Sequence, residues 1–262
     1  MSRASVADIL CIGAQRSMTS WLHRVISAHP STWAFPNNEP VTSTAKEAHY
    51  WDWNHHRGET WYRVLMRPLD DQKLSLDFTP DYAFLNDDQI ADCKRLNPSA
   101  KLIYILRDPL ARAVSAVRMH TMWATNSAAA DAHTIEYGNQ FLERCKNARL
   151  WEHGAYAENV ARWRKAYPDM LLLNFEDLVR NPLDGARKVF EHCDLSLVEL
   201  PDATRAVIET RARSVVWQTK AYPLDDDCLN FLHGMTWRDR QTALSDLEMS
   251  FSEESRLMEQ IS

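Results

Sequence analysis

The sequence predicts an α/β fold in three layers, with a central parallel sheet and helices on both faces. Three short apolar runs read as buried strands, at residues 6–12, 101–106 and 170–174. A polar turn and then apolar residues at helical spacing follow each run. Strands that alternate with helices form parallel sheets covered on both faces. A single domain over residues 1–262 is expected, because 262 residues with 45% hydrophobic composition can bury one large core.

The helix after each strand has its own sequence signal. After the first run, apolar residues recur at helical spacing from Met18 to Ile26. After the second, Asp108 can cap a helix whose first residue is Pro109. After the third, Pro182 opens a helical pattern in the same way. Ligands of such folds bind beyond the carboxyl ends of the strands, so the turns after the first two strands are the expected site.

Composition excludes several classes of protein. Ten tryptophans and 6 glycines argue against a disordered or fibrous chain. A formal net charge of −6 argues against a broad polyanion-binding surface, so no nucleic-acid partner is expected. The 5 cysteines are spread out with no CxxC pair, which predicts reduced thiols and a cytoplasmic location. No stretch approaches 18 apolar residues, so neither a signal peptide nor a membrane partner is expected. Residues 126–131 predict a surface loop.

The turn at residues 13–20 (GAQRSMTS) joins the first strand to its helix and predicts an anion site. Free amides and the helix dipole attract anions there, Arg16 adds a cation, and Ser17, Thr19 and Ser20 add hydroxyl donors. The turn is not a Walker A loop, because that pattern needs glycine at 18 and lysine at 19, where this chain has Met18 and Thr19. An ordinary strand–helix turn with a solvated arginine is the alternative.

Several motifs together resemble those of the sulfotransferases that use 3′-phosphoadenosine 5′-phosphosulfate (PAPS). Residues 12–20 with His29 and Pro30 resemble the 5′-phosphosulfate loop of that family. Residues 102–109 (LIYILRDP), with Arg112 and Ser115, resemble its 3′-phosphate motif. Residues 47–53 (EAHYWDW) are similar to the acceptor segment of the heparan sulfate 3-O- and N-sulfotransferase branch. Three further segments follow in the expected order, at residues 77–82, 154–156 and 175–182.

The resemblance implies a P-loop-like fold and transfer of a sulfuryl group from PAPS to a hydroxyl or amine of a small-molecule or saccharide-like acceptor. No metal is required for that transfer. The implied catalytic residues are Glu47 as general base, Arg16 beside the leaving phosphate, and His49, which with Asp52 orients the base or the acceptor. The implied nucleotide-binding residues are Arg16, Ser17, Met18, Thr19 and Ser20 at the 5′ end and Arg107 and Ser115 at the 3′-phosphate.

Two positions depart from the resemblance. Most relatives have glycine at the position of Met18, so a left-handed backbone there would cost about 1–2 kcal/mol. Phe78 stands where the heparan sulfate branch has a lysine that reaches into the active site, so one positive contact is expected to be missing. For Glu47 the alternative is a solvated glutamate paired with Lys46. For Arg107 it is an arginine in a turn that caps its own helix.

Other features leave alternatives open. The pair His55–His56 suggests a metal, but no ligand motif accompanies it, so no metal site is expected. The aromatic residues of this region could stack on an acceptor or form core: Tyr50, Trp51, Trp53, Trp61 and Tyr62. Arg211, Arg213 or Lys220 could cover the nucleotide. An ATP-dependent P-loop phosphotransferase and a non-catalytic nucleotide-binding homologue are the competing functions, and a homodimer is left open.

Overall fold

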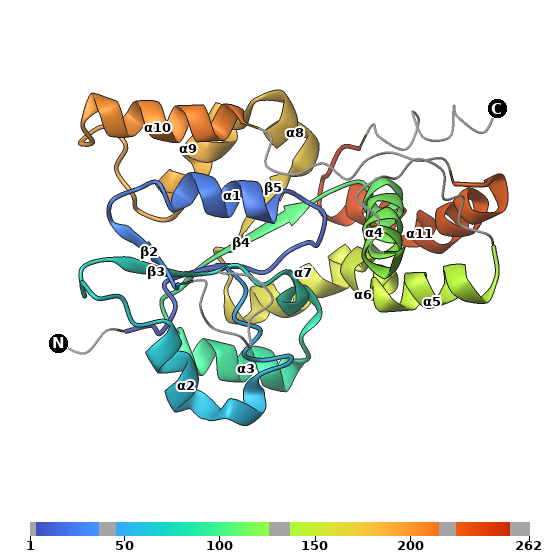
Figure 1. Cartoon of the computed structure of the whole chain (residues 1–262), viewed down its shortest axis with the longest axis horizontal. Coiled ribbons are helices and arrows are strands. Elements are labelled where there is room, and N and C mark those ends of the chain that lie inside the picture. Colours follow the sequence, from blue (N-terminus) through green and yellow to red (C-terminus); the bar gives the residue numbers. More distant parts are fainter. Residues whose placement is uncertain (1–3, 37–45, 126–136, 215–223, 252–262) are drawn as a thin grey trace.

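Five short parallel strands form one sheet in the order β2-β3-β1-β4-β5 (Figure 1). The computed structural model describes residues 4–36, 46–125, 137–214 and 224–251. The strands are β1 (Ile9–Cys11), β2 (Thr32–Ala34), β3 (Leu74–Asp77), β4 (Lys101–Leu106) and β5 (Leu171–Asn174). The predicted parallel sheet is confirmed.

The central strand β1 pairs with β3 on one side and β4 on the other. Ile9 lies opposite Leu76 of β3, and Cys11 lies opposite Ile103 of β4. Since successive side chains of a strand point to opposite faces, Leu10 contributes to one core, while Ile9 and Cys11 contribute to the other. Both faces of the sheet are therefore buried, as the apolar runs predicted.

Helices cover each face (Figure 1). One layer contains α1 (Thr19–Ile26), α8 (Phe175–Arg180), α9 (Pro182–His192) and α10 (Asp202–Arg213). The opposite layer contains α2 (Gly58–Leu65), α3 (Asp87–Leu96) and α7 (Tyr156–Ala166). The three-layer α/β architecture expected from the sequence is confirmed.

The remaining helices form a separate apolar cluster at one side of the molecule (Figure 1). They are α4 (Pro109–Thr125), α5 (Asn139–Asn147), α6 (Leu150–Gly154) and α11 (Asp226–Asp246). Two short 3₁₀ segments complete the described elements, η1 (His55–Arg57) and η2 (Pro80–Phe84). Because α4 follows β4 directly, this cluster sits beside the loop that the sequence indicated for the nucleotide.

The predicted helix starts are confirmed, whereas the strands were predicted incompletely. The amide of Ala111 donates to Asp108 Oδ1 at 2.9 Å, and Pro182 is the first residue of α9. The strand predicted at residues 6–12 is shorter than expected, spanning Ile9–Cys11, and β2 and β3 were not predicted. The surface loop predicted at residues 126–131 lies outside the described residues.

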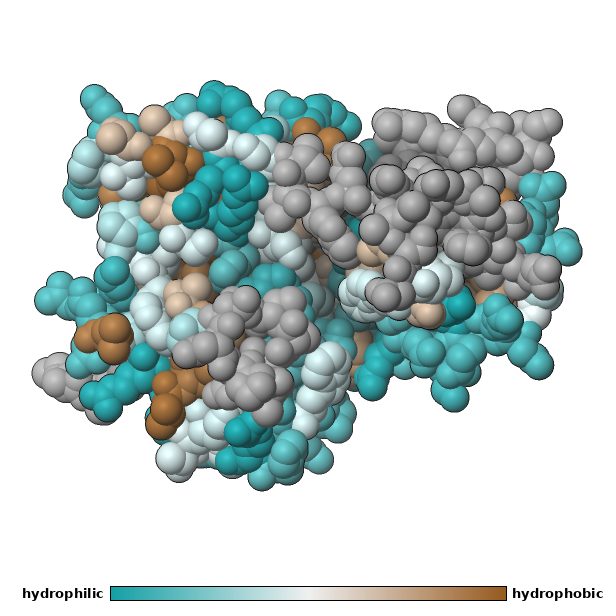
Figure 2. Space-filling view, viewed as in Figure 1, coloured by the Kyte–Doolittle hydropathy of each residue, from teal (hydrophilic) through white to brown (hydrophobic). Residues whose placement is uncertain are grey.

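Large apolar side chains are exposed at several separate places on the described surface, among them Leu69, Val198 and Trp151. On the face in Figure 2, apolar side chains of the coloured residues occur in small separate groups among hydrophilic ones. Within the described ranges, no helix is both long and apolar enough to cross a bilayer. The homodimer and the cytoplasmic location stay predictions.

Candidate active site

The loop between β1 and α1 holds two non-glycine residues in the left-handed region. Arg16 has φ 68°, and Met18, the N-cap of α1, has φ 66° and ψ 20°. A methionine at this dihedral costs about 1–2 kcal/mol. The loop thus adopts at position 18 a left-handed backbone conformation that favours glycine, although this chain has methionine there.

Gly13 fixes the start of the same loop. Its φ is 141°, and a Cβ on this residue would lie 2.9 Å from the carbonyl oxygen of Pro80 in η2. Only glycine combines this dihedral with so close an approach. The end of β1 is therefore packed against the end of β3.

The start of α1 offers unpaired donors. The first-turn amides of a helix have no partner within the helix, and Met18 makes no side-chain cap. Ser17 is fully buried, and its hydroxyl has no hydrogen-bond partner among the described residues. Thr19 is buried, whereas Ser20 is exposed. A buried hydroxyl without a partner beside free amides fits an anionic ligand such as a phosphate.

Arg16, Arg107 and Ser115 converge although they come from different elements. Arg16 Nε donates to Ser115 Oγ at 3.0 Å, and Arg107 Nη1 donates to the carbonyl oxygen of Arg16 at 3.1 Å. Burial, and then the nearby charge of Arg107, lower the pKa of Arg16 to about 10, which leaves it protonated at neutral pH. Two guanidinium groups that repel each other in one place form a site for an anion.

Sequence reasoning assigned Arg16 and Ser115 to opposite ends of the nucleotide and missed their direct contact. It also missed two partners. Arg16 Nη1 lies 3.4 Å from Met119 Sδ, and the Arg107 guanidinium carbon lies 4.3 Å from the ring centroid of Phe175. No local pattern signals these contacts, because they depend on side-chain direction across neighbouring strands.

The second half of the site is the segment that contains Glu47. Glu47 forms an ion pair with Lys46, and its other oxygen lies 3.5 Å from His49 Nε2. The side chains of Lys46 and Glu47 are only 10% and 15% exposed. The pairing expected for a solvated glutamate thus occurs, but in a largely desolvated position, where a carboxylate can act as a base.

His49 links Glu47 to Asp52. His49 Nδ1 lies 2.7 Å from Asp52 Oδ2, in line with the expected orienting pair. Burial opposes the charged imidazole, but hydrogen bonds with Asp52 and Glu47 prevail and raise the pKa of His49 to about 9. At neutral pH His49 is therefore an imidazolium between two carboxylates.

The aromatic residues divide between the core and the site. Tyr50, Trp51 and Tyr62 are buried in the core. Trp53 is 50% exposed, and its ring stacks on His49 with centroids 3.5 Å apart and planes at 3°. Trp53 is the aromatic side chain of this group that offers a stacking face next to Glu47.

Asp77, at the end of β3, holds the Glu47 segment in place. One carboxylate oxygen accepts from the Ala48 amide and the Thr79 hydroxyl, and the other from the hydroxyls of Tyr62 and Tyr82. Burial raises the pKa of Asp77 to about 6, although these four donors act in the opposite direction. Sequence reasoning missed this role, because an aspartate that ends a strand has no distinctive local pattern.

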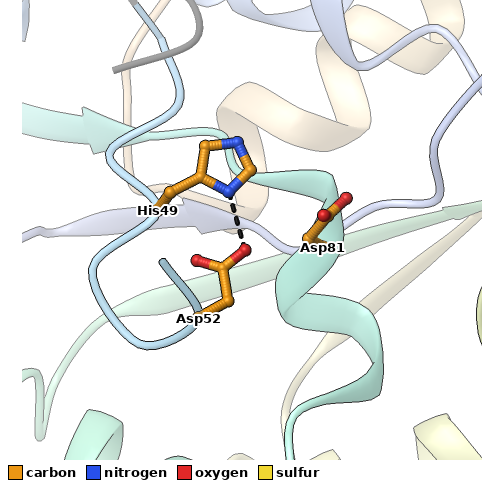
Figure 3. A group of neighbouring side chains, drawn as sticks. All are labelled: His49, Asp52 and Asp81. Atoms are coloured by element: carbon orange, nitrogen blue, oxygen red, sulfur yellow. Dashed lines mark hydrogen bonds and ion pairs between the residues drawn. The ribbon is translucent and has the colours of Figure 1, made fainter. Parts of the chain in front are cut away.

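His49, Asp52 and Asp81 lie together (Figure 3). One ligand-type atom from each lies within 4.8 Å of the others, and Asp81 comes from η2. Asp81 Oδ1 also lies 3.3 Å from His153 Nε2. His49 already shares its Nδ1 proton with Asp52, and the absence of a metal requirement stays a prediction. His55 and His56 are exposed.

Phe78 takes no part in the site through its side chain. The ring is fully buried and lies edge-on to His23 at 5.2 Å. Its backbone binds Lys46 twice: its amide donates to the Lys46 carbonyl at 2.7 Å, and Lys46 Nζ donates to its carbonyl at 3.4 Å. The ammonium of Lys46 therefore lies next to Phe78, whose own side chain provides no charge.

The basic residues at the end of α10 have local partners. Arg211 Nη1 donates to the carbonyl of Arg24 at 3.0 Å, and Arg213 pairs with Glu209 at 3.1 Å. Lys220 lies outside the described residues. A covering role for Arg211 or Arg213 stays a prediction.

Known proteins of similar sequence are sulfotransferases. Heparan sulfate glucosamine 3-O-sulfotransferase 3A1 of Mus musculus is 27% identical over 198 residues, which cover 72% of this chain and 46% of that protein. Heparan sulfate glucosamine 3-O-sulfotransferase 6 of Homo sapiens is 25% identical over 199 residues, which cover 75% of this chain and 54% of that protein. The chain thus spans about half the length of these relatives.

Solved structures share the fold. A sulfotransferase from Alicyclobacillus acidocaldarius aligns with a TM-score of 0.67 and 19% identity, covering 97% of this chain and 100% of that one. A sulfotransferase from Mycobacterium avium aligns with a TM-score of 0.62 and 12% identity, covering 95% and 79%. Residues 7–221 match the sulfotransferase domain family, a span that includes every site residue described above. The chain belongs to the sulfotransferase domain family.

Proposed function

We propose that this chain transfers a sulfuryl group from PAPS to a hydroxyl or amine of a small-molecule or saccharide-like acceptor. The convergence of Arg16, Arg107 and Ser115 carries the proposal, because it brings the loops that follow β1 and β4 close enough to bind one nucleotide. Arg107 and the Ser115 hydroxyl suit the 3′-phosphate that distinguishes PAPS from ATP, and Arg16 suits the 5′-phosphosulfate. The buried Ser17 hydroxyl and the free amides of α1 suit the 5′-phosphosulfate.

In the proposed reaction, the acceptor oxygen or nitrogen forms a bond to sulfur as the bond from sulfur to the 5′-phosphate oxygen breaks. The electron pair of the broken bond stays on that phosphate oxygen, and adenosine 3′,5′-bisphosphate (PAP) leaves. Glu47 takes the acceptor proton, and His49 holds the carboxylate in place. Arg16 stabilises the charge that develops on the phosphate, as a group that remains cationic.

The proposed acceptor is saccharide-like. Relatives of similar sequence are named for glucosamine in heparan sulfate. In this chain Trp53 offers a half-exposed ring beside Glu47, which suits the face of a sugar or another ring. A saccharide-like acceptor is therefore the first class to screen with labelled PAPS.

Thermal shift with nucleotides tests the proposal. We expect PAP to raise the melting temperature well beyond the effect of ADP at equal concentration, because a ligand that binds only the folded state stabilises it. In the Arg107→Ala variant the response to PAP should fall to that of adenosine 5′-monophosphate, which lacks the 3′-phosphate.

Each competing function gives its own result in the thermal-shift experiment or in the acceptor screen. Stronger stabilisation by ADP than by PAP supports the ATP-dependent phosphotransferase. PAP binding without release of PAP from PAPS, across the acceptor screen, supports the non-catalytic nucleotide-binding homologue. Equal weakening of both adenosine ligands in Arg107→Ala would make Arg107 structural.

A further inference from the structure

Lys46 places a largely buried ammonium next to Glu47 and the backbone of Phe78. Its Nζ pairs with Glu47 and lies 3.4 Å from the Phe78 carbonyl, and its side chain is only 10% exposed. Burying a lysine is costly, since its charge must leave water. A cation kept in such a position is typical of sites that bind or stabilise negative charge.

Lys46 and His23 both lie against Phe78, the residue that follows β3. Lys46 Nζ donates to the Phe78 carbonyl oxygen at 3.4 Å, and the His23 ring centroid lies 5.2 Å from that of the Phe78 ring. The charges of Lys46 and Glu47 also act on the Cys11 thiol at the end of β1 and on His23 in α1. The loop at residues 13–20 connects this strand to this helix. Lys46 therefore lies beside the loop proposed to hold the 5′-phosphosulfate, and next to the proposed base.

His23 adds a second nitrogen at the same place. Its Nε2 is buried and has no hydrogen-bond partner within the described part of the chain. Burial, and then the charge of Lys46, lower the pKa of His23 to about 4, so the ring is neutral and carries one N–H donor. A buried polar nitrogen without a partner costs free energy unless a ligand satisfies it.

We infer that Lys46 and His23 form the subsite for the sulfuryl oxygens of PAPS, an inference that rests on the proposed function. The Arg16 guanidinium binds Ser115 and that of Arg107 binds the Arg16 carbonyl oxygen, so we assign both charges to the phosphate groups of the nucleotide. The sulfuryl group needs its own donors next to Glu47, where the acceptor must approach. An ammonium ion and a neutral N–H meet that need.

Comparing the affinities for PAPS and PAP by calorimetry tests the subsite, because PAP lacks only the sulfuryl group. We expect Lys46→Met and His23→Phe each to weaken PAPS binding on the order of tenfold, the value of a charged hydrogen bond, and to leave PAP binding unchanged. Lys46→Arg keeps the cation and should recover part of the PAPS affinity. Lys188→Met, on the exposed face of α9, is the matched control.

Unchanged PAP affinity also shows that each variant is folded. His23→Phe leaves the Lys46–Glu47 pair in place, so it tests the subsite even where Lys46→Met fails to fold. Equal weakening of PAPS and PAP, or no change in either, would overturn the subsite while the proposed function stands. A wild-type chain that binds neither nucleotide would overturn both.

Discussion

Both oxygens of the Glu47 carboxylate are engaged before any acceptor arrives. One pairs with Lys46, and the other lies 3.5 Å from the imidazolium of His49. Both partners hold the carboxylate in position, and His49 is itself fixed by Asp52. Glu47 is therefore oriented by its neighbours, as a base must be if it is to meet one particular proton.

Replacing Glu47 by glutamine removes the base while preserving its shape. We expect Glu47→Gln to keep PAP affinity and to lose at least about 100-fold in turnover, the lower range for general base catalysis. The measurement is release of PAP from labelled PAPS with an acceptor, next to PAP binding by calorimetry. Glu191→Gln, on the exposed side of α9, is the control, and equal activity in both variants would remove Glu47 from the base role.

The start of α1 depends on a single strained residue. Met18 is left-handed at the N-cap and makes no side-chain cap, yet its side chain packs against the core of that layer. We expect Met18→Gly to be about 1 kcal/mol more stable than Met18→Ala, because both lose the packing but only glycine adopts the dihedral without strain. Chemical denaturation of the two variants measures this difference. Equal stability would mean that the loop takes another path.

The elements that the sequence predicted correctly have a long apolar run or a helix-start signal. The strand β4 has six apolar-rich residues, and α4 and α9 begin at prolines. The strands β2 (TWA) and β3 (LSLD) contain polar residues among their apolar ones, so no continuous apolar run marks them. The strand β3 forms by pairing with β1, and β2 forms by pairing with β3, so both depend on tertiary contacts.

Candidate site residues were predicted where they lie in motifs that occur in the expected order. Contacts that depend on side-chain direction were missed. Glu47, His49 and Arg107 were predicted as site residues because they lie in recognisable segments, and their roles stay predictions. The contact between Arg16 and Ser115 joins residues 99 positions apart, and it needs the left-handed dihedral of Arg16. His23, which we infer to belong to the sulfuryl subsite, carries no sequence signal, because a histidine on an apolar helix face is usually structural.

At the scale of the whole molecule, His49 makes stability depend on pH. Its pKa is about 9 in the folded chain against an ordinary 6.5 when unfolded. The folded state holds the proton more tightly, so this contribution is fully present below pH 6.5 and is lost as pH rises through about 9. We expect the unfolding free energy to fall by about 1–3 kcal/mol over that range.

Denaturant unfolding at pH 6 and pH 9.5 measures this loss. His49→Gln should show a flatter profile between the two values, because glutamine has no proton to release. The same decline in both proteins would assign the effect to other groups and remove His49 as its source.

The four hydrogen bonds to Asp77 have a practical consequence for protein engineering. The Glu47 segment belongs to no helix or strand, so its position depends on the hydrogen-bond network of Asp77 at the end of β3. A library of variants meant to alter acceptor choice should therefore randomise the half-exposed residue Trp53. It should leave Asp77 and its four donors intact, since altering them would displace the Glu47 segment before any new acceptor preference could be selected.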